Sequence, residues 1–294
     1  MREFTEVKID PPNEAYREAA ELVRKLQSAG FEAYFVGGCV RDLLLKLAPE
    51  DFDIAANAKP EEVQRLFPQA RGVGKRFGVS LVPVSAGEVE VAAFRQDGPY
   101  FDHRRPAWVQ YAGIEEDAWR RDFSINALYY NPVSGQVVDL VAGLPDLEQR
   151  ILRVIGDPFE RLDEDWLRLL RAVRFAARFN LEFEFVTWDA LRALAPLVVG
   201  VSMERRTEEV RRMLKGPNPV KAIGLLYASG LWKALWGDLP FSQKRLIKMM
   251  DSFDKDVNRS FIWRDFLGDL STEWAEKAAQ NLTLTRAEKR TIGL

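Results

Sequence analysis

The stretch FVGGCVRDLLLKLAPEDFDIA, residues 35–55, decides how this chain folds. It begins as an apolar strand, turns at Gly37 and Gly38, opens a helix and then reaches Asp51 and Asp53. Two carboxylates one residue apart in an extended segment lie on the same face, because side chains alternate along a strand. Like charges this close repel each other unless a cation joins them, so the pair predicts a site for a divalent metal.

The paired glycines supply the second half of this prediction. Gly37 and Gly38 let the backbone approach a phosphate closely, and the N–H groups that open the following helix favour an anion. A paired-glycine turn alone is common, and a lone Asp-x-Asp is more often a solvated loop. Both in one short stretch indicate a metal–triphosphate site.

The composition bounds the class of protein. The 294 residues suffice for two or three compact units. A net charge of −2 argues against a generally basic nucleic-acid binder but leaves room for a local basic groove. The single cysteine, Cys39, excludes a disulfide framework, and the single histidine, His103, argues against a histidine metal site or a Ser-His-Asp triad.

The ends and the hydropathy of the chain suggest where it works. The first residues, MREFTEVKIDPPNEAY, contain no apolar signal region, and no stretch is long and apolar enough to span a membrane. With its one cysteine, we expect a cytoplasmic protein that is not attached to a membrane.

The first half of the chain alternates helical and strand patterns, whereas only helical periodicity follows Gly143. This predicts an α+β protein with a small mixed sheet followed by helices. Residues 97–111 are polar, aromatic and basic, and are expected to form a mobile loop. The predicted elements of the sheet region are a helix over 11–30, strands over 31–36, 79–84 and 88–95, and a hairpin of 128–130 with 137–140.

Two further groups of residues fit a nucleotide-binding site, but each also has a simpler structural explanation. Glu90 could stand across the sheet from Asp51 and Asp53 as a third carboxylate, or be a surface residue of an edge strand. Arg121 suits a phosphate and Asp122 could accept from a sugar hydroxyl, although neighbouring Arg and Asp often form a surface salt bridge.

A helix is predicted from Asp163 to Arg178. The spacing of Glu164, Asp165 and Arg168 lets all three meet on one face, and Arg171 and Arg174 prolong a basic stripe. From spacing alone, ion pairing on a solvated face is favoured over recognition of a nucleotide base.

Five ordered motifs between residues 30 and 215 give the chain its resemblance to a known family. The chain resembles the class II tRNA nucleotidyltransferase and bacterial poly(A) polymerase family, of the polymerase β type. The matching segments are GGCVRDLLL with DFDIA, VEVAAFR, RRDFSINALYYNP, EDWLRLLRAVRFAARF and SMERRTEEVRRML.

The resemblance implies a fold and a set of site residues. It implies a mixed-sheet nucleotidyltransferase head over 1–145, a helical neck that recognises the base over 146–215, and a helical body or short tail over 216–294. Glu164, Asp165 and Arg168 match the motif with which the family selects the base. For these residues the resemblance therefore favours base recognition over ion pairing on a solvated face. The implied roles are two Mg²⁺ ions on Asp51 and Asp53 with Glu90 as third carboxylate, the triphosphate on Gly37, Gly38 and Arg41, the ribose on Asp122 with Arg121 and Asn126, the base on Glu164, Asp165 and Arg168, and RNA on Arg171, Arg174, Arg104 and Arg105.

The resemblance also implies an activity. It implies addition of C and/or A to the 3′ end of tRNA from CTP and/or ATP, without a template and with release of pyrophosphate. A poly(A) polymerase, or an enzyme that adds only A or only CC, is the alternative. A non-enzymatic RNA-binding protein is less favoured, because no carboxylate of the motif is missing. Family members usually carry more helical chain after the neck, so the tRNA contacts stay open, as does the oligomeric state, with a monomer favoured.

Overall fold

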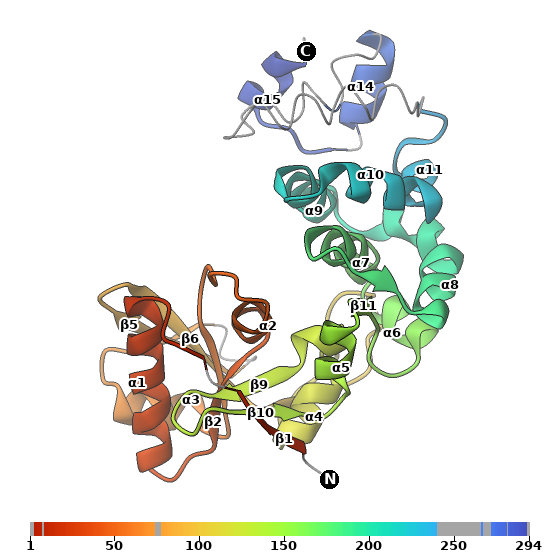
Figure 1. Cartoon of the computed structure of the whole chain (residues 1–294). Coiled ribbons are helices and arrows are strands. Elements are labelled where there is room, and N and C mark those ends of the chain that lie inside the picture. The colour runs from red at the N-terminus through yellow and green to blue at the C-terminus, as the bar shows by residue number, and fades with distance from the viewer. Residues whose placement is uncertain are drawn as a thin grey trace. The chain divides into compact units, whose positions relative to one another are not determined.

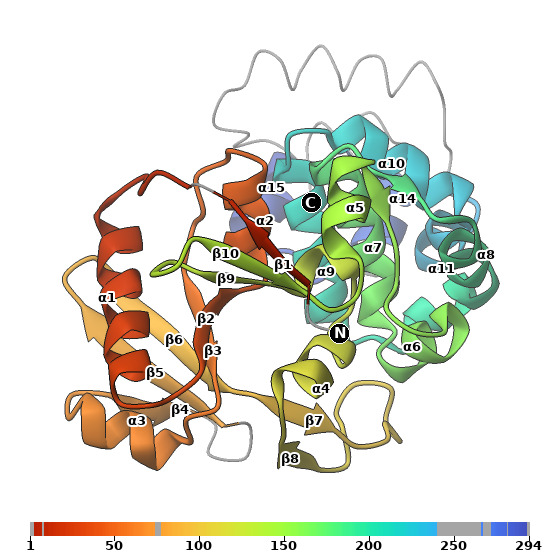
Figure 2. The same cartoon turned by 60° about the horizontal axis from the view of Figure 1, so that its bottom comes forward.

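The computed structural model of the chain describes residues 3–7, 9–73, 78–239, 266, 272–280 and 282–292. The chain divides into two compact units, Met1–Asp157 and Pro158–Leu294, which are described one at a time (Figures 1 and 2). This places the end of the sheet-containing unit at Asp157. The finer division into head, neck and body stays a prediction.

The first unit is the mixed α and β part that the hydropathy pattern predicts. Its elements are β1 (Glu3–Glu6), α1 (Glu14–Ser28), β2 (Ala33–Val36), α2 (Gly38–Leu44), β3 (Asp53–Ala56), α3 (Pro60–Leu66), β4 (Arg71–Val73), β5 (Val79–Val84), β6 (Gly87–Ala93), β7 (Arg95–Asp97), β8 (Val109–Tyr111), α4 (Ile114–Trp119), the 3₁₀ turn η1 (Ser124–Asn126), β9 (Leu128–Asn131), β10 (Gln136–Asp139), α5 (Gly143–Glu148) and β11 (Ile151–Leu152).

The main sheet has eight strands in the order β1-β10-β9-β2-β3-β6-β5-β4. Strands β3 and β6 run parallel, and the other pairs for which a register is known run antiparallel. The predicted mixed sheet and the β9–β10 hairpin are therefore confirmed. The parallel pair is central, so both of its strands are hydrogen-bonded on each side.

One face of the sheet is covered by α1, which packs on β2 and on α3. The helix begins at Asn13, whose side chain accepts a hydrogen bond of 2.9 Å from the backbone N–H of Tyr16. The Tyr16 ring then meets Phe35 and Phe52 edge-on, with centroids 5.4 and 5.7 Å apart. Phe35 and Phe52 thus point to the α1 side, and alternation sends Val36 and Asp53 to the opposite side.

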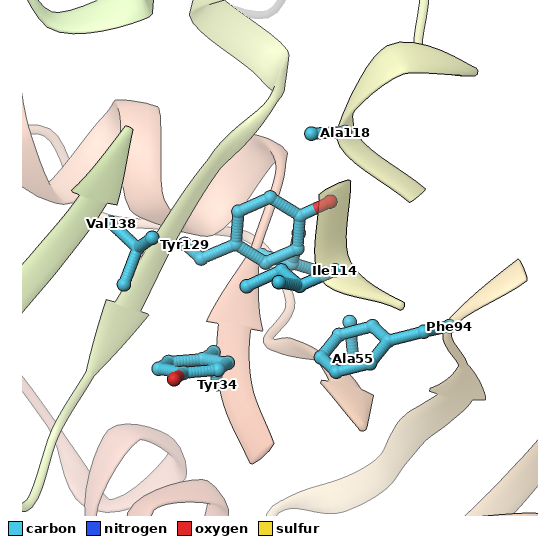
Figure 3. Close-up of a cluster of buried hydrophobic side chains, with 8 residues drawn as sticks. Tyr34, Ala55, Phe94, Ile114, Ala118, Tyr129 and Val138 are labelled. Atoms are coloured by element: carbon cyan, nitrogen blue, oxygen red, sulfur yellow. The ribbon is translucent and has the colours of Figure 1, made fainter. Parts of the chain in front are cut away.

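The opposite face is covered by α4, whose Ile114 and Ala118 are fully buried (Figure 3). Tyr34, Phe94 and Tyr129 contact one another there, with ring centroids 6.2 to 6.5 Å apart. Burial of each such side chain stabilises the fold by about 1.5–3 kcal/mol. The complete cluster is Tyr34, Val36, Ala55, Phe94, Ile114, Ala118, Tyr129 and Val138.

The segment expected to be a loop, residues 97–111, has regular structure at both ends. Strand β7 pairs antiparallel with β8, and Tyr100 bridges to Pro106. Gly98 donates to the Trp108 carbonyl at 2.9 Å, and a β-carbon at Gly98 would overlap the Trp108 ring. The glycine and the aromatic residue facing it therefore support a hairpin within the segment, and its mobility stays a prediction.

The described residues of the second unit are almost entirely helical, apart from one two-residue strand. Its elements are α6 (Pro158–Glu164), α7 (Leu167–Arg178), β12 (Glu182–Phe183), α8 (Phe185–Leu194), the 3₁₀ helix η2 (Ala195–Gly200), α9 (Met203–Lys215), α10 (Pro219–Ala228), α11 (Leu231–Trp236), α14 (Thr272–Gln280) and α15 (Arg286–Thr291). Part of the helical body predicted over 216–294 lies outside the described residues. Within the described residues, no helix is both long and apolar enough to cross a membrane.

The continuous helix predicted from Asp163 to Arg178 was wrong. Helix α6 ends at Glu164 and α7 begins at Leu167. The reason is local, because the Asp165 carboxylate accepts a 3.1 Å hydrogen bond from the Leu167 N–H. Such a side-chain bond competes with the helical ladder. Helix α7 then packs on α9 and α10.

Replacement of Gly143 by alanine tests the packing that supports η1. A β-carbon at Gly143 would overlap the Ser124 carbonyl oxygen, a backbone atom that cannot move aside alone. We expect Gly143→Ala to destabilise the protein by about 1–3 kcal/mol and to lower its melting temperature by several degrees. Gly72→Ala is the matched control, since nothing lies within 4 Å of a β-carbon there. Equal melting temperatures for the two variants would contradict this packing.

Candidate active site

The parallel pairing of β3 with β6 places Asp53 directly beside Glu90. Both side chains point to the face that α4 covers, because Ala55, two residues after Asp53, belongs to the cluster under α4. Strand β6 lies between β3 and β5, which rules out the reading of Glu90 as an edge-strand residue. Asp51 is exposed and lies two residues before β3, so the two aspartates do not share one strand as expected.

The electrostatics of Asp53 reflect this crowding of carboxylates. Burial, together with the negative charges of Asp51 and Glu90, raises the pKa of Asp53 to about 7, and the nearby Arg121 opposes the rise. A divalent cation beside these groups would remove the repulsion. The donor set therefore fits a hard cation that prefers oxygen ligands.

The described residues would supply only part of the ligands of such a metal ion. In the described part of the chain, no group of three or more His, Cys, Asp or Glu side chains is arranged to hold a metal ion. Mg²⁺ commonly binds through one or two carboxylates and completes its shell with water and substrate phosphates. Asp51 and Asp53 fit a magnesium ion that is shared with a nucleotide.

The turn at Gly37 brings the end of β2 to the same place. Gly37 has φ = 75°, a conformation that L side chains rarely adopt, and it caps α2. A β-carbon there would lie 3.4 Å from Nη1 of Arg121 and 3.7 Å from the Asn126 carbonyl oxygen. The Gly37 N–H donates to the Leu128 carbonyl at 3.2 Å, so this turn is tied to the start of β9.

Arg41 is buried and bound within the protein. Its Nε and Nη2 donate to the Asp42 carboxylate at 2.8 and 2.6 Å, and its Nη1 donates to the Asn126 side-chain oxygen at 2.5 Å. Asn126 in turn donates to Asp122 at 3.1 Å. The structure therefore brings Arg41 together with Asn126 and Asp122, two of the residues expected at the ribose. Its role as a triphosphate ligand stays a prediction.

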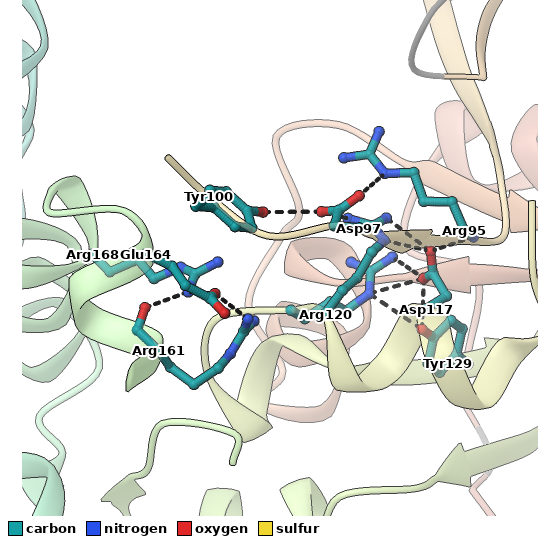
Figure 4. Close-up of polar contacts among 10 residues, drawn as sticks. Arg95, Asp97, Tyr100, Asp117, Arg120, Tyr129, Arg161, Glu164 and Arg168 are labelled. Carbon is teal, nitrogen blue, oxygen red and sulfur yellow. Dashed lines mark hydrogen bonds and ion pairs between the residues drawn. The ribbon is translucent and has the colours of Figure 1, made fainter. Parts of the chain in front are cut away.

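Asp117, which the sequence reasoning missed, organises the arginines of this face (Figure 4). Its carboxylate accepts from Arg120 at 2.8 Å, from Arg121 at 2.9 Å and from the Tyr129 hydroxyl at 2.7 Å. Burial alone would raise the pKa of Asp117, but Arg121 and Arg120 outweigh it and lower that pKa to about 2. The i,i+4 spacing of Asp117 and Arg121 was the available signal.

In the second unit, the residues expected at the base take part in three ion pairs. Arg168 donates to Glu164 at 2.8 Å, and Arg161 pairs with the same carboxylate (Figure 4). Asp165 pairs with Arg205 of α9 at 3.2 Å, a partner that the sequence reasoning did not identify. Glu164 therefore holds Arg168, as the resemblance implied, whereas Asp165 is held from another helix.

The arginines expected to contact RNA differ in exposure. Arg104 and Arg105 are exposed, and Asp102 accepts from their backbone N–H groups at 3.0 and 2.7 Å. Arg171 is half-buried, with its guanidinium carbon 5.1 Å from the centre of the Phe175 ring. Arg174 is only 6% exposed and donates to Glu209 at 2.7 Å, so its geometry favours a structural role.

Comparisons with known proteins match both units. Residues 33–153 match the family described as the poly A polymerase head domain, and residues 180–240 match the probable RNA and SrmB-binding site of polymerase A. The CCA-adding enzyme of Streptococcus gordonii is 43% identical over 237 residues, 80% of this chain and 59% of that enzyme. Poly(A) polymerase I of Haemophilus influenzae is 38% identical over 268 residues, 84% of this chain and 59% of that protein.

Solved structures agree with the sequence matches. The CCA-adding enzyme of Bacillus stearothermophilus in complex with CTP has a TM-score of 0.68 and 30% identity, covering 91% of this chain and 69% of that one. The fold is also that of the Thermotoga maritima CCA-adding enzyme complexed with tRNA, with a TM-score of 0.77, 23% identity, and coverage of 100% of this chain and 73% of that one. The chain spans 59% of the length of the Streptococcus gordonii and Haemophilus influenzae relatives. With its central parallel strand pair and its match to a CCA-adding enzyme over most of both chains, the protein belongs to the tRNA nucleotidyltransferase and bacterial poly(A) polymerase family.

Proposed function

We propose that the protein is a template-independent RNA nucleotidyltransferase that adds C and/or A to the 3′ end of tRNA. Its substrates are CTP and/or ATP and a tRNA end, and its by-product is pyrophosphate. The observation that carries the proposal is the pairing of Asp53 with Glu90, next to Asp51 and on the sheet face that Arg121 shares. The relatives named CCA-adding enzymes support tRNA as the acceptor.

A poly(A) polymerase is the second candidate, because a protein of that name is 38% identical over 84% of this chain. Transcripts of tRNA that end before the first C, after the first C and after the second C separate the possibilities. Each is offered CTP alone or ATP alone. Product lengths then distinguish CCA, CC, A and poly(A) addition.

The proposal assigns Asp51 and Asp53 to magnesium that is shared with the nucleotide. When bound there, Mg²⁺ supplies Lewis-acid stabilisation of the charge on the phosphates. The protein's own part is to hold the two carboxylates beside the Gly37 turn, where the backbone permits close approach of a triphosphate. Arg121 adds a positive charge next to this turn, since its Nη1 lies against Gly37.

The remaining residues orient the nucleotide. Asp122 and Asn126, which are joined by a 3.1 Å hydrogen bond, present an acceptor and an amide to the ribose. Arg168, fixed by Glu164, and Asp165, fixed by Arg205, offer donors and an acceptor for the edge of the incoming base. Arg104, Arg105 and Arg171 are proposed to contact the RNA backbone.

Removal of one carboxylate tests the catalytic assignment. We expect Asp51→Asn and Asp53→Asn each to lower incorporation of labelled CTP or ATP into tRNA that lacks CCA by about 100-fold or more, because each removes an anionic oxygen donor. Glu90→Gln is expected to lose at least about tenfold.

Glu88→Gln is the matched control for Glu90→Gln. Glu88 lies two residues earlier on the same face of β6, is exposed, and pairs with Arg71. We expect its activity to stay within about twofold of the unaltered protein. A loss of less than tenfold for both aspartate variants, at unchanged folding, would refute the assignment.

A Glu164→Gln variant tests base selection. The change weakens the ion pair between Glu164 and Arg168, so the guanidinium is held less firmly beside its remaining bond to the Arg161 carbonyl. We expect the preference for CTP and ATP over UTP and GTP, expressed as a ratio of kcat/KM, to fall by about tenfold. Glu182→Gln, which removes only an exposed pair with Lys221, should leave the ratio unchanged. An unaltered ratio in Glu164→Gln would show that this carboxylate does not support base recognition.

A further inference from the structure

Asp117 is a buried carboxylate whose two oxygens are both occupied by donors. Its side chain is only 1% exposed. One oxygen accepts from the Arg95 backbone N–H at 3.3 Å and from Nε and Nη2 of Arg120 at 3.0 and 2.8 Å. The other accepts from Nε and Nη2 of Arg121 at 3.2 and 2.9 Å and from the Tyr129 hydroxyl at 2.7 Å. The group therefore ties the hairpin strand β7, helix α4 and strand β9 together.

These bonds fix the orientation of the Arg121 guanidinium. Its Nε–Nη2 edge lies on Asp117, and its Nε also donates to the Tyr129 hydroxyl at 3.2 Å. Its central carbon stands 5.4 Å from the centre of the Tyr129 ring. The remaining nitrogen, Nη1, lies on the side of Gly37, 3.4 Å from where a β-carbon would be. The Nε–Nη2 edge is bound by Asp117 and Tyr129, and Nη1 lies on the side of the glycine turn.

Further ion pairs extend from Asp117 to Arg120, Asp97 and Arg95 (Figure 4). Asp97 pairs with Arg95 at 3.0 Å and lies 3.9 Å from Arg120, and Asp117 pairs with both Arg120 and Arg121. Three arginines thus alternate with two aspartates. An arginine stands at each end of this series, and the Arg121 end lies next to Gly37, where its charge would attract an anion.

We propose that Asp117 is a positioning residue for the incoming nucleotide. It holds the Arg121 guanidinium against the Gly37 turn, so that Nη1 is already aimed when the nucleotide's phosphates arrive. The inference rests on the proposed function, because it takes a nucleoside triphosphate as the ligand of this turn. Such preorganisation removes the entropy loss of ordering a long side chain during binding.

A plain structural role for Asp117 is the competing explanation, and a double-mutant cycle separates the two. If Asp117 acts through Arg121, its replacement matters only while Arg121 is present. We expect Asp117→Asn to raise KM for CTP and ATP by about tenfold, to change kcat less than KM, and to leave KM for tRNA within about twofold. Arg121→Met is expected to raise the nucleotide KM at least as much. The double variant should lie within about twofold of Arg121→Met alone.

Asp146→Asn is the matched control. Asp146 is a buried carboxylate of the same unit that accepts from Ser124 at 2.6 Å and from Arg153 at 3.0 Å, without contact to Arg121. Its replacement likewise removes the charge of a buried carboxylate that is paired with an arginine, here one that is 42% exposed. We expect its nucleotide KM to stay within about twofold of the unaltered protein even if its melting temperature falls.

The outcomes separate this inference from the proposed function. If the unaltered protein transfers neither CMP nor AMP, the proposed function fails. If it is active but Asp117→Asn leaves nucleotide KM unchanged, or adds its full effect to Arg121→Met, the inference is overturned. Should Asp117→Asn not fold, Tyr129→Phe decides, since it removes a hydroxyl bonded to both Asp117 and Arg121. A threefold or larger rise in its nucleotide KM supports the inference, and a smaller one overturns it.

Discussion

The parallel pairing of β3 and β6 is the constraint on which the candidate site depends. It sets Asp53 beside Glu90 on one sheet face, with Asp51 close enough to raise the pKa of Asp53 further. A stable protein gains nothing from gathering carboxylates in this way unless a positive partner is shared among them. The fold therefore holds an electrostatic strain that a bound cation would relieve.

The rest of the first unit brings other groups to the same end of the sheet. Antiparallel β2 ends at the Gly37 turn beside the start of β3, and β9 starts next to this turn on the other side of β2. Helix α4 covers this face with Ile114 and Ala118, its last turn carries Asp117, and Arg121 follows directly after its C-cap, Arg120. The packing of the hydrophobic cluster therefore fixes the positions of Asp117 and Arg121.

The sequence was informative where short motifs carry their own geometry. The glycine pair and the alternation around Glu90 predicted the strands and the face of Glu90, whereas of the two aspartates only Asp53 lies in a strand. The ion pair of Glu164 with Arg168 also followed from helical spacing. Family membership could be recognised because five such motifs occur in a fixed order.

The remaining contacts depend on tertiary structure, which spacing does not reveal. Arg205 reaches Asp165 from 40 positions along the chain, and Arg41 reaches Asn126 from 85. The burial of Arg174 against Glu209 likewise depends on how α7 packs on α9. The break at Asp165 and the hairpin around Gly98 each arise from one local contact that periodicity overlooks. Asp117 was not predicted as a site residue, because its role depends on the number of donors that its carboxylate contacts in the folded protein.

A structure of the protein with a nonhydrolysable CTP analogue and Mn²⁺ in place of magnesium tests the central claim most directly. Anomalous scattering would locate the cation. The account predicts it within bonding distance of carboxylate oxygens of Asp51 and Asp53, with the triphosphate at the Gly37 turn and in contact with Arg121. Cation or phosphates bound elsewhere, with these carboxylates uninvolved, would contradict it.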